Sequence, residues 1–169
     1  MQIFLIGFMG CGKSTIGKVL AKDLDYTFVD MDEEIEEKES RSINDIFKEN
    51  GERAFRGIET QFLTEISQRE DVVCACGGGA PCFNDNISVM KKAGFVVYLA
   101  LDEVELYNRL LAEKEKRPLI RNLNDDQLKR HITNNLLQRK LCYSKATEKV
   151  DTNGKNVQQI TEDILRLFP

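Results

Sequence analysis

The sequence predicts a single three-layer α/β domain, in which a central parallel sheet of five strands is covered by helices on both faces. Short apolar runs alternate along the chain with longer amphipathic stretches. Strands that are apolar throughout are buried on both faces, and such strands form parallel sheets between layers of helices. A chain of 169 residues fits one domain and leaves little room for a second. The predicted domain therefore spans residues 1–169.

Five short runs predict the strands. They cover residues 2–6, 26–29, 71–76, 95–101 and 148–151. Gly7 ends the first run, and three consecutive glycines follow the third. Because these runs are separated by helical stretches, we expect the strands to lie parallel.

Helices are predicted where apolar side chains recur every three or four residues, as Phe55, Ile58 and Phe62 do. Asp102 lies where an N-cap is needed before the stretch at 103–115. Residues 116–125 contain Pro118 and show no periodicity, so they predict a loop. The helical stretches are 13–24, 33–38, 43–49, 52–68, 84–93, 103–115, 126–145 and 157–168.

Composition narrows the classes of partner. The net charge of -4 argues against nucleic acid or an anionic membrane as the main partner. No stretch approaches the roughly 20 apolar residues that span a bilayer, and Gly7 interrupts the first apolar run too early for a secretory leader.

The five cysteines are odd in number, and Cys74-Ala75-Cys76 lacks the second pair that a zinc site needs. We expect a cytoplasmic protein with buried thiols.

The strongest motif is G-x4-G-K-S, which runs from Gly7 to Ser14 between the first strand and the first helix. Its glycines let backbone N–H groups turn toward phosphate oxygens, and the helix N-terminus favours negative charge. Lys13 can contact the β- and γ-phosphates, and the Ser14 hydroxyl can bind Mg²⁺. The motif predicts that the chain binds a nucleoside triphosphate through Gly10, Cys11, Gly12, Lys13, Ser14 and Thr15.

A second residue for the magnesium shell is expected at the end of another strand. Asp30, Asp102 and Asp151 all end predicted strands. Asp102 is explained as a helix cap, and Asp151 precedes a turn near the end of the chain, so Asp30 is the best candidate. Met31 follows it, where a hydrolytic ATPase needs Glu or Gln to position water. This favours transfer to a bound acceptor over hydrolysis.

Five further elements follow the phosphate loop: Asp30-Met31-Asp32, Phe55-Arg56-x-x-Glu59, the triple glycine Gly77-Gly78-Gly79, Arg117-Pro118-Leu119 and Arg139-x3-Tyr143. In their order and spacing they resemble the shikimate kinases. The resemblance runs from Ile3 to about Asp151. It implies a P-loop kinase fold that uses ATP and Mg²⁺ to phosphorylate the 3-hydroxyl of shikimate, a step of aromatic amino acid biosynthesis.

The resemblance also implies the roles of the acceptor residues. Asp32 binds the hydroxyls of shikimate and orients or deprotonates the nucleophile, although a helix cap gives the same pattern. Arg56 and Arg139 are planar forks suited to a carboxylate, and by resemblance they hold that of shikimate. From the residues alone, either arginine could lie on the surface. The triple glycine lines the acceptor pocket, where the lack of side chains lets a ligand approach the backbone.

Two arginines are assigned to the nucleotide side by the same resemblance. Arg117 lies in a lid segment near residues 112–125 and closes over the phosphates, where it can stabilise charge on the transferring group. Arg109 lies beside the adenine, although a solvent-facing arginine gives the same pattern. The predicted catalytic residues are therefore Lys13, Asp32 and Arg117.

Two departures from the family pattern and two alternatives remain open. Cys76 stands where the family usually has Ser or Thr, so a hydroxyl contact to a magnesium-bound water is in doubt. Cys11 occupies a loop position where a small residue is typical. The alternatives are another small-molecule P-loop kinase, such as a gluconate or nucleoside monophosphate kinase, or a non-catalytic nucleotide-binding protein. A monomer is expected.

Overall fold

A parallel sheet of five strands lies at the centre of the computed structural model, which describes residues 1–169. This confirms the predicted fold class. The strand order is β2-β3-β1-β4-β5, with every neighbouring pair parallel. The strands are β1 (Gln2–Ile6), β2 (Thr27–Asp30), β3 (Val72–Ala75), β4 (Gly94–Ala100) and β5 (Glu148–Asp151).

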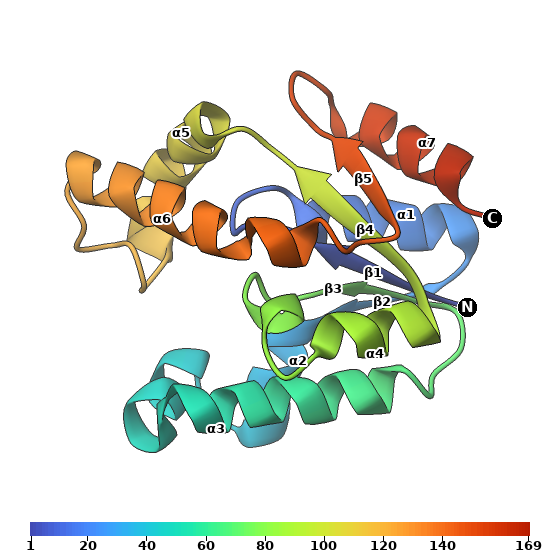
Figure 1. Ribbon diagram of the computed structural model, residues 1–169, viewed down its shortest axis with the longest axis horizontal. Helices are drawn as coiled ribbons and strands as arrows, with labels where there is room; N and C mark the ends of the chain where they lie inside the picture. The colour runs from blue at the N-terminus through green and yellow to red at the C-terminus, as the bar shows by residue number, and fades with distance from the viewer.

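Helices cover both faces of the sheet, as Figure 1 shows. The helices are α1 (Lys13–Leu24), α2 (Met31–Glu39), α3 (Ile43–Ile66), α4 (Asn86–Ala93), α5 (Glu103–Glu113), α6 (Asp125–Tyr143) and α7 (Val157–Leu167). Two short 3₁₀ helices, η1 (Ala80–Cys82) and η2 (Lys114–Lys116), follow the triple glycine and α5. None of the helices combines the length and the apolar character needed to cross a membrane.

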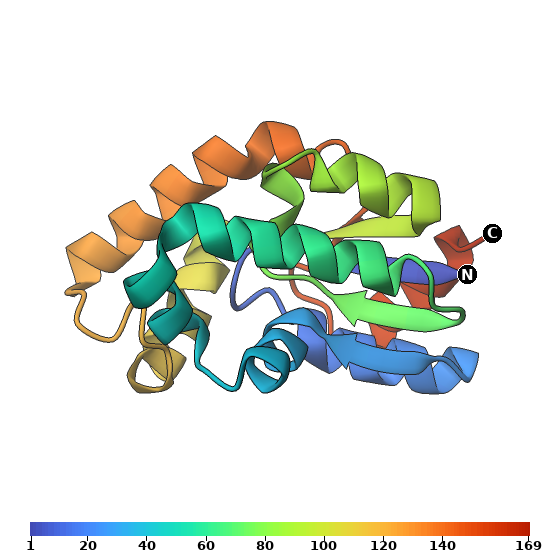
Figure 2. The same cartoon turned by 90° about the horizontal axis from the view of Figure 1, so that it is seen from below.

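The central strand β1 feeds two separate cores because its side chains alternate between the faces of the sheet. Ile3 and Leu5 pack into one core with side chains of α1, α5, α7 and the first half of α6. Phe4 and Ile6 pack into the other, with side chains of α2, α3 and α4 and with Tyr143 at the end of α6. Figure 2 shows α3 and α4 side by side over this second face. Helix α6 therefore contributes to both cores.

The boundaries differ from the predicted ones in ways that have local causes. The stretches 43–49 and 52–68 join into α3, which is kinked at Gly51, where φ is 78° and ψ is 170°. Helix α2 begins at Met31 rather than at 33, because the Asp30 carboxylate caps it by accepting from the N–H groups of Asp32 and Glu33. Asp102 is the N-cap of α5, as predicted.

Three strands deliver their carboxyl ends to one edge of the sheet. Leu5 of β1 pairs in register with Ala75 of β3, which also pairs with Asp30 of β2. The phosphate loop follows β1, the aspartates follow β2, and the triple glycine follows β3. From β3 the chain crosses to β4 on the opposite side of β1. Ligands of open parallel sheets bind at such a reversal of strand order.

The close packing of α1 on the sheet generates a stability prediction. A Cβ added at Gly17 would lie 2.6 Å from the ring of Phe28 and 3.3 Å from Leu5. We expect Gly17→Ala to destabilise the protein by about 1–3 kcal/mol, because the core must shift to admit the methyl group. Urea unfolding followed by circular dichroism measures this change.

The control is the same substitution at Gly57, where an added Cβ would meet nothing within 4 Å. Gly57→Ala should stabilise helix α3 by about 0.4–1 kcal/mol, since alanine restricts the unfolded chain more than glycine does. Equal effects at both positions would contradict the packing of α1 described here.

Candidate active site

The loop between β1 and α1 is shaped to bind an anion. Gly10 and Gly12 have φ values of 82° and 99°, a conformation that favours glycine. No side chain caps the N-terminus of α1 or α4, whereas side chains cap α2, α3, α5, α6 and α7. The first N–H groups of a helix have no partner within it, so those of α1 are available to phosphate oxygens.

Lys13 is held over this loop by the loop itself. Its ammonium group donates to the carbonyl oxygens of Gly7 at 2.9 Å and Phe8 at 3.1 Å. Cys11 does not reach the surface of the loop: its side chain is 1% exposed and its N–H donates to Phe8. The structure thus brings Lys13 to the site but leaves Cys11 beneath it.

Ser14 and Asp30 form an oxygen-rich corner beside the loop. The Ser14 hydroxyl donates to Asp30 Oδ2 at 2.6 Å, and the other oxygen of Asp30 caps α2. No group of three or more His, Cys, Asp or Glu side chains could hold a metal unaided. This donor set fits Mg²⁺, which takes one or two protein oxygens together with waters and phosphate oxygens. The thiol of Cys76 donates toward the Cys74 carbonyl at 3.8 Å, so it adds no oxygen ligand.

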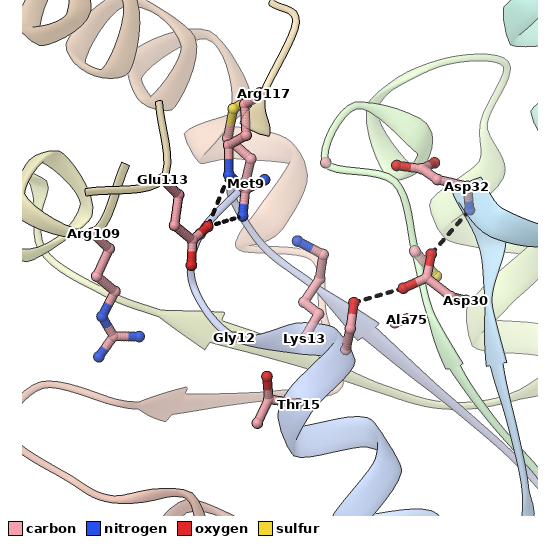
Figure 3. A pocket seen from close by; sticks show the side chains of 14 residues that line it. Met9, Gly12, Lys13, Thr15, Asp30, Asp32, Ala75, Arg109, Glu113 and Arg117 are labelled. Atoms are coloured by element: carbon pink, nitrogen blue, oxygen red, sulfur yellow. Dashed lines mark hydrogen bonds and ion pairs between the residues drawn. The ribbon is translucent and has the colours of Figure 1, made fainter. Parts of the chain in front are cut away.

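A cavity of about 310 Å³ opens over the loop (Figure 3). The phosphate loop and the start of α1 form its base, and Asp30 and Asp32 lie on one side. Arg109, Glu113 and Arg117 lie on the other side. Arg117 donates from Nε and Nη2 to Glu113 at 3.0 and 2.6 Å, and Arg109 donates to Glu105 at 2.9 Å. The lining also includes Gly10, Gly12, Lys13, Ser14 and Thr15.

A second cavity of about 320 Å³ adjoins the first. Its polar side chains come from α2, α3, α6 and the end of η2 with the residue after it, and its apolar wall comes mainly from α3 and from the segment after η2. A larger hollow of about 650 Å³, between α6 and the β4–α5 junction, contains none of the predicted site residues. The second cavity is lined by Arg56, Glu59, Gly77, Gly78, Gly79 and Arg139, with Ile43, Phe47, Phe55 and Leu119 as the apolar wall.

The two arginines of the second cavity differ in their partners. Arg56 donates to Glu59 at 2.7 Å in a pair whose side chains are 12% and 1% exposed, and it also pairs with Glu52. Its guanidinium carbon lies 4.1 Å from the ring centre of Phe83, within cation–π range. Arg139 makes no ion pair with the protein. Its charge is therefore free to pair with an anion in the cavity.

At the triple glycine, neighbouring side chains leave no room for a Cβ atom. A Cβ at Gly77 would lie 2.9 Å from Asp32 Oδ1, and one at Gly79 would lie 2.8 Å from Arg56 Nη2. A Cβ at Gly78 would approach Nη1 of Arg139 to 3.2 Å. None of the three has a positive φ, so backbone conformation does not impose glycine here. Each glycine instead makes room for one polar group of the site.

Asp32 lies where the two cavities meet, because it lines both. Its side chain is exposed to water in the cavities, although many protein atoms surround it. Burial, followed by the charge of Asp30, raises the pKa of Asp32 to about 6, while Lys13 opposes the rise. Such a carboxylate is ionised at neutral pH and still accepts a proton readily. Burial likewise raises the pKa of Glu59 to about 7, against the effect of Arg56.

Comparisons with known proteins identify the family. The family model for shikimate kinase matches residues 9–168. A shikimate kinase of Bacteroides fragilis is 42% identical over 146 residues, which are 86% of this chain and 82% of the relative. The chain belongs to the shikimate kinase family. This confirms the predicted enzyme class, an ATP-dependent kinase that phosphorylates shikimate, and the alternative kinases and the non-catalytic protein are not favoured.

Solved structures of shikimate kinases share the whole fold. The enzyme from Bacteroides thetaiotaomicron aligns with a TM-score of 0.94 at 34% identity, covering 99% of this chain and 97% of that one. The Acinetobacter baumannii enzyme, solved in complex with shikimate, aligns with a TM-score of 0.87 at 36% identity, covering 98% and 91%. The match covers both cavities, which lie within the aligned domain.

The sequence motifs assign no role to several residues that line the cavities. Glu59 belongs to the motif Phe55-Arg56-x-x-Glu59, and its spacing of three residues along a helix is the signal for its ion pair with Arg56. Met9 lines both cavities, and Glu113 lines the first cavity beside Arg117. No local pattern marks Met9 or Glu113, since their positions depend on where α5 and the loop pack.

The space requirement at the triple glycine generates a prediction. Gly79 has φ −91° and ψ −21°, which alanine adopts freely, so Gly79→Ala should fold. Its methyl group should push the Arg56 guanidinium out of its present position. The ion pairs with Glu59 and Glu52 keep the guanidinium from rotating freely to a new one. We expect the KM for shikimate to rise about tenfold while the KM for ATP stays within about twofold, since a misplacement of about 1 Å is costly in such sites.

Steady-state kinetics with each substrate varied in turn measure this effect. The control is Gly57→Ala, the same change beside Arg56 in sequence but facing open space. An unchanged KM for shikimate in Gly79→Ala would show that Arg56 is not fixed by its partners.

Proposed function

We propose that the two adjoining cavities hold ATP and shikimate, and that the γ-phosphoryl group passes to the 3-hydroxyl of shikimate where they meet. The observation that carries this proposal is that the cavities share four lining residues, Met9, Asp32, Gly78 and Arg117. A phosphoryl donor and an acceptor held in the two cavities would therefore be neighbours. Holding both in line supplies a large part of the rate enhancement of phosphoryl transfer.

On the nucleotide side, the N–H groups of the loop and of α1 hold the phosphates. Lys13 exchanges its bonds to the loop carbonyls for bonds to phosphate oxygens. Thr15 and Arg109 complete the wall of the nucleotide cavity, with Arg109 toward the adenine. These contacts neutralise charge at the position where it develops during transfer.

Mg²⁺ would be held by Ser14, with Asp30 fixing the magnesium-bound waters. When bound, the ion supplies positive charge to the phosphate oxygens of ATP. The oxygen donors at this corner support the assignment. Asp30 caps α2 with its other oxygen, so the corner is anchored to the fold.

On the acceptor side, Arg139 and Arg56 hold the carboxylate of shikimate, and the apolar wall packs against its ring. Arg139 supplies the unpaired charge, and Arg56 supplies a fork fixed by Glu59. The triple glycine provides the close backbone surface. Asp32 orients the 3-hydroxyl and accepts its proton as the phosphoryl group transfers.

Closure of the lid near residues 112–125 would bring Arg117 from Glu113 to the transferring group. Arg117 and Lys116 lie in this segment and line the acceptor cavity, which supports the assignment. Closure would exclude water, the competing acceptor. The monomeric state, the absence of a nucleic acid or membrane partner, and the cytoplasmic location stay predictions.

The test of the function is ADP release in a coupled assay with shikimate, gluconate and nucleoside monophosphates in parallel. We expect release that requires shikimate and is lost when EDTA removes Mg²⁺. Lys13→Ala should reduce turnover by at least about a hundredfold, since charge contacts of this kind contribute about 3–4 kcal/mol. ATP hydrolysis that is equal with and without shikimate would rule out the proposed transfer.

The raised pKa of Asp32 predicts an acid limb in the pH profile. Protonation of Asp32 removes the proton acceptor, so kcat/KM for shikimate should fall tenfold per pH unit below about pH 6. Asp32→Asn should have low activity and lose this limb. Glu59→Gln is the control, because it removes the neighbouring titration near pH 7 and should leave the limb near pH 6 in place.

Because Arg56 has carboxylate partners and Arg139 has none, we expect their substitution by alanine to affect stability differently. Arg139→Ala should lower kcat/KM for shikimate by about thirtyfold or more, with little change in Tm, because it leaves no protein charge unpaired. Arg56→Ala should have a similar kinetic effect and also lower Tm, because it strips Glu59 of its partner.

The loss of Tm in Arg56→Ala should grow as pH rises. A carboxyl group whose folded-state pKa is raised stabilises the fold below its unfolded pKa and loses that contribution as pH rises through the folded value. In the wild type, the contribution of Glu59 is lost between its ordinary pKa of 4.5 and about pH 7. Arg56 lowers the pKa of Glu59, so without Arg56 that pKa rises further and the variant keeps losing stability above pH 7, where the wild type no longer does. Thermal unfolding at pH 6 and pH 8 measures the difference, and a pH-independent Tm loss would contradict the burial of Glu59.

A further inference from the structure

The five cysteines include two pairs of neighbouring thiols, and only one pair is open to solvent. Cys74 and Cys76, at the end of β3, have sulfur atoms 3.9 Å apart, and their side chains are 0% and 1% exposed. Cys82 of η1 and Cys142 of α6 are far apart in sequence, and both are partly exposed. The two pairs therefore differ in their access to small oxidants.

Cys82 and Cys142 lie between two elements of the acceptor cavity. Cα atoms of η1 and α6 approach within 8 Å, both thiols lie against the same core, and each thiol is the largest influence on the pKa of the other. Cys82 follows Gly79 by three residues, and Cys142 follows Arg139 by one helical turn. The Tyr143 hydroxyl donates to the Gly78 carbonyl at 2.6 Å, which fixes α6 against the triple glycine.

The pKa values of the two thiols shift in opposite directions. The neighbouring Cys82, followed by Lys145 and Arg139, lowers the pKa of Cys142 against the effect of burial. The neighbouring Cys142 and burial raise the pKa of Cys82 against the charges of Arg139 and Arg56. The thiolate is the nucleophilic form of cysteine, and nearby cations favour it. Cys142 is therefore the thiol expected to react first with an oxidant, and Cys82 the thiol that then reacts with oxidised Cys142.

We propose that Cys82 and Cys142 are a site of reversible oxidation by hydrogen peroxide, which joins the triple-glycine segment to α6 through a disulfide. The Cys142 thiolate attacks one peroxide oxygen, the O–O bond breaks, and the leaving hydroxide takes up a proton to become water. Cys82 then attacks the sulfenic sulfur, an S–S bond forms, and a second water leaves with the Cys82 proton. The two thiols lose two electrons and two protons, and the peroxide becomes two waters.

The disulfide alters the acceptor side of the active site. Bonded sulfurs lie about 2.05 Å apart, so the bond draws η1 and α6 together. Gly79 and Arg139 lie on these elements, within a few residues of the bond. This step rests on the proposed role of Arg139 in holding shikimate. Oxidation should raise the KM for shikimate at least about fivefold and leave the KM for ATP within about twofold, since small misplacements weaken such sites.

The experiment treats the whole enzyme with hydrogen peroxide, blocks remaining thiols with iodoacetamide, and maps the peptides by mass spectrometry. We expect a peptide pair linked through Cys82 and Cys142 that dithiothreitol separates, with the shikimate KM restored in parallel. The absence of this link would overturn the proposal. A complete link with an unchanged shikimate KM would overturn its effect on the acceptor site, while the coupled assay for ADP tests the kinase mechanism separately.

Matched variants complete the design. Cys82→Ser and Cys142→Ser should each abolish the link and make the shikimate KM insensitive to peroxide, with reduced-state activity near wild type. Cys74→Ser changes the buried pair and should leave the link and the KM shift intact. Peroxide sensitivity that follows Cys74 instead would overturn the assignment.

Discussion

The register of the three central strands determines where the chemistry lies. Leu5, Asp30 and Ala75 stand side by side across β1, β2 and β3, so the segments that follow these strands emerge together. One segment is the loop proposed to bind phosphate, one carries Asp30 and Asp32, and one is the triple glycine. A slip of two residues in either pairing would keep the same faces buried, yet it would shift one segment by about 7 Å along the strand. Such a shift would separate nucleotide from acceptor.

In the second cavity, side chains of the site pack closely against the backbone of the triple glycine. A charged or polar side chain of the site occupies the space where each missing Cβ would be: Asp32, Arg139 and Arg56. Glu59 forms an ion pair with Arg56, and the ring of Phe83 packs against the face of the Arg56 guanidinium. The guanidinium is therefore already fixed, so in the proposed mechanism less side-chain entropy would be lost on binding a carboxylate. Arg139 lies over the ring of Phe8 but has no carboxylate partner, so its charge would remain available to the ligand.

The sequence predicts the features that depend on local chemistry. The phosphate loop follows from glycines that adopt positive φ, and the break near Gly51 follows from the same residue type, although the structure retains one kinked helix there. The roles of Asp32 and Arg139 came only with the family resemblance. The burial of Glu59 and the meeting of Cys82 with Cys142 depend on how α3 and α6 pack, and no short pattern records that packing.

The uncapped start of α1 links the lifetime of the protein to its substrate. Because no side chain satisfies the first N–H groups of this helix, bound nucleotide is their natural partner. Ligand at a hundred times its Kd stabilises a fold by about 2.7 kcal/mol. Proteases cut transiently opened chains, so a bound nucleotide would also protect the enzyme against degradation.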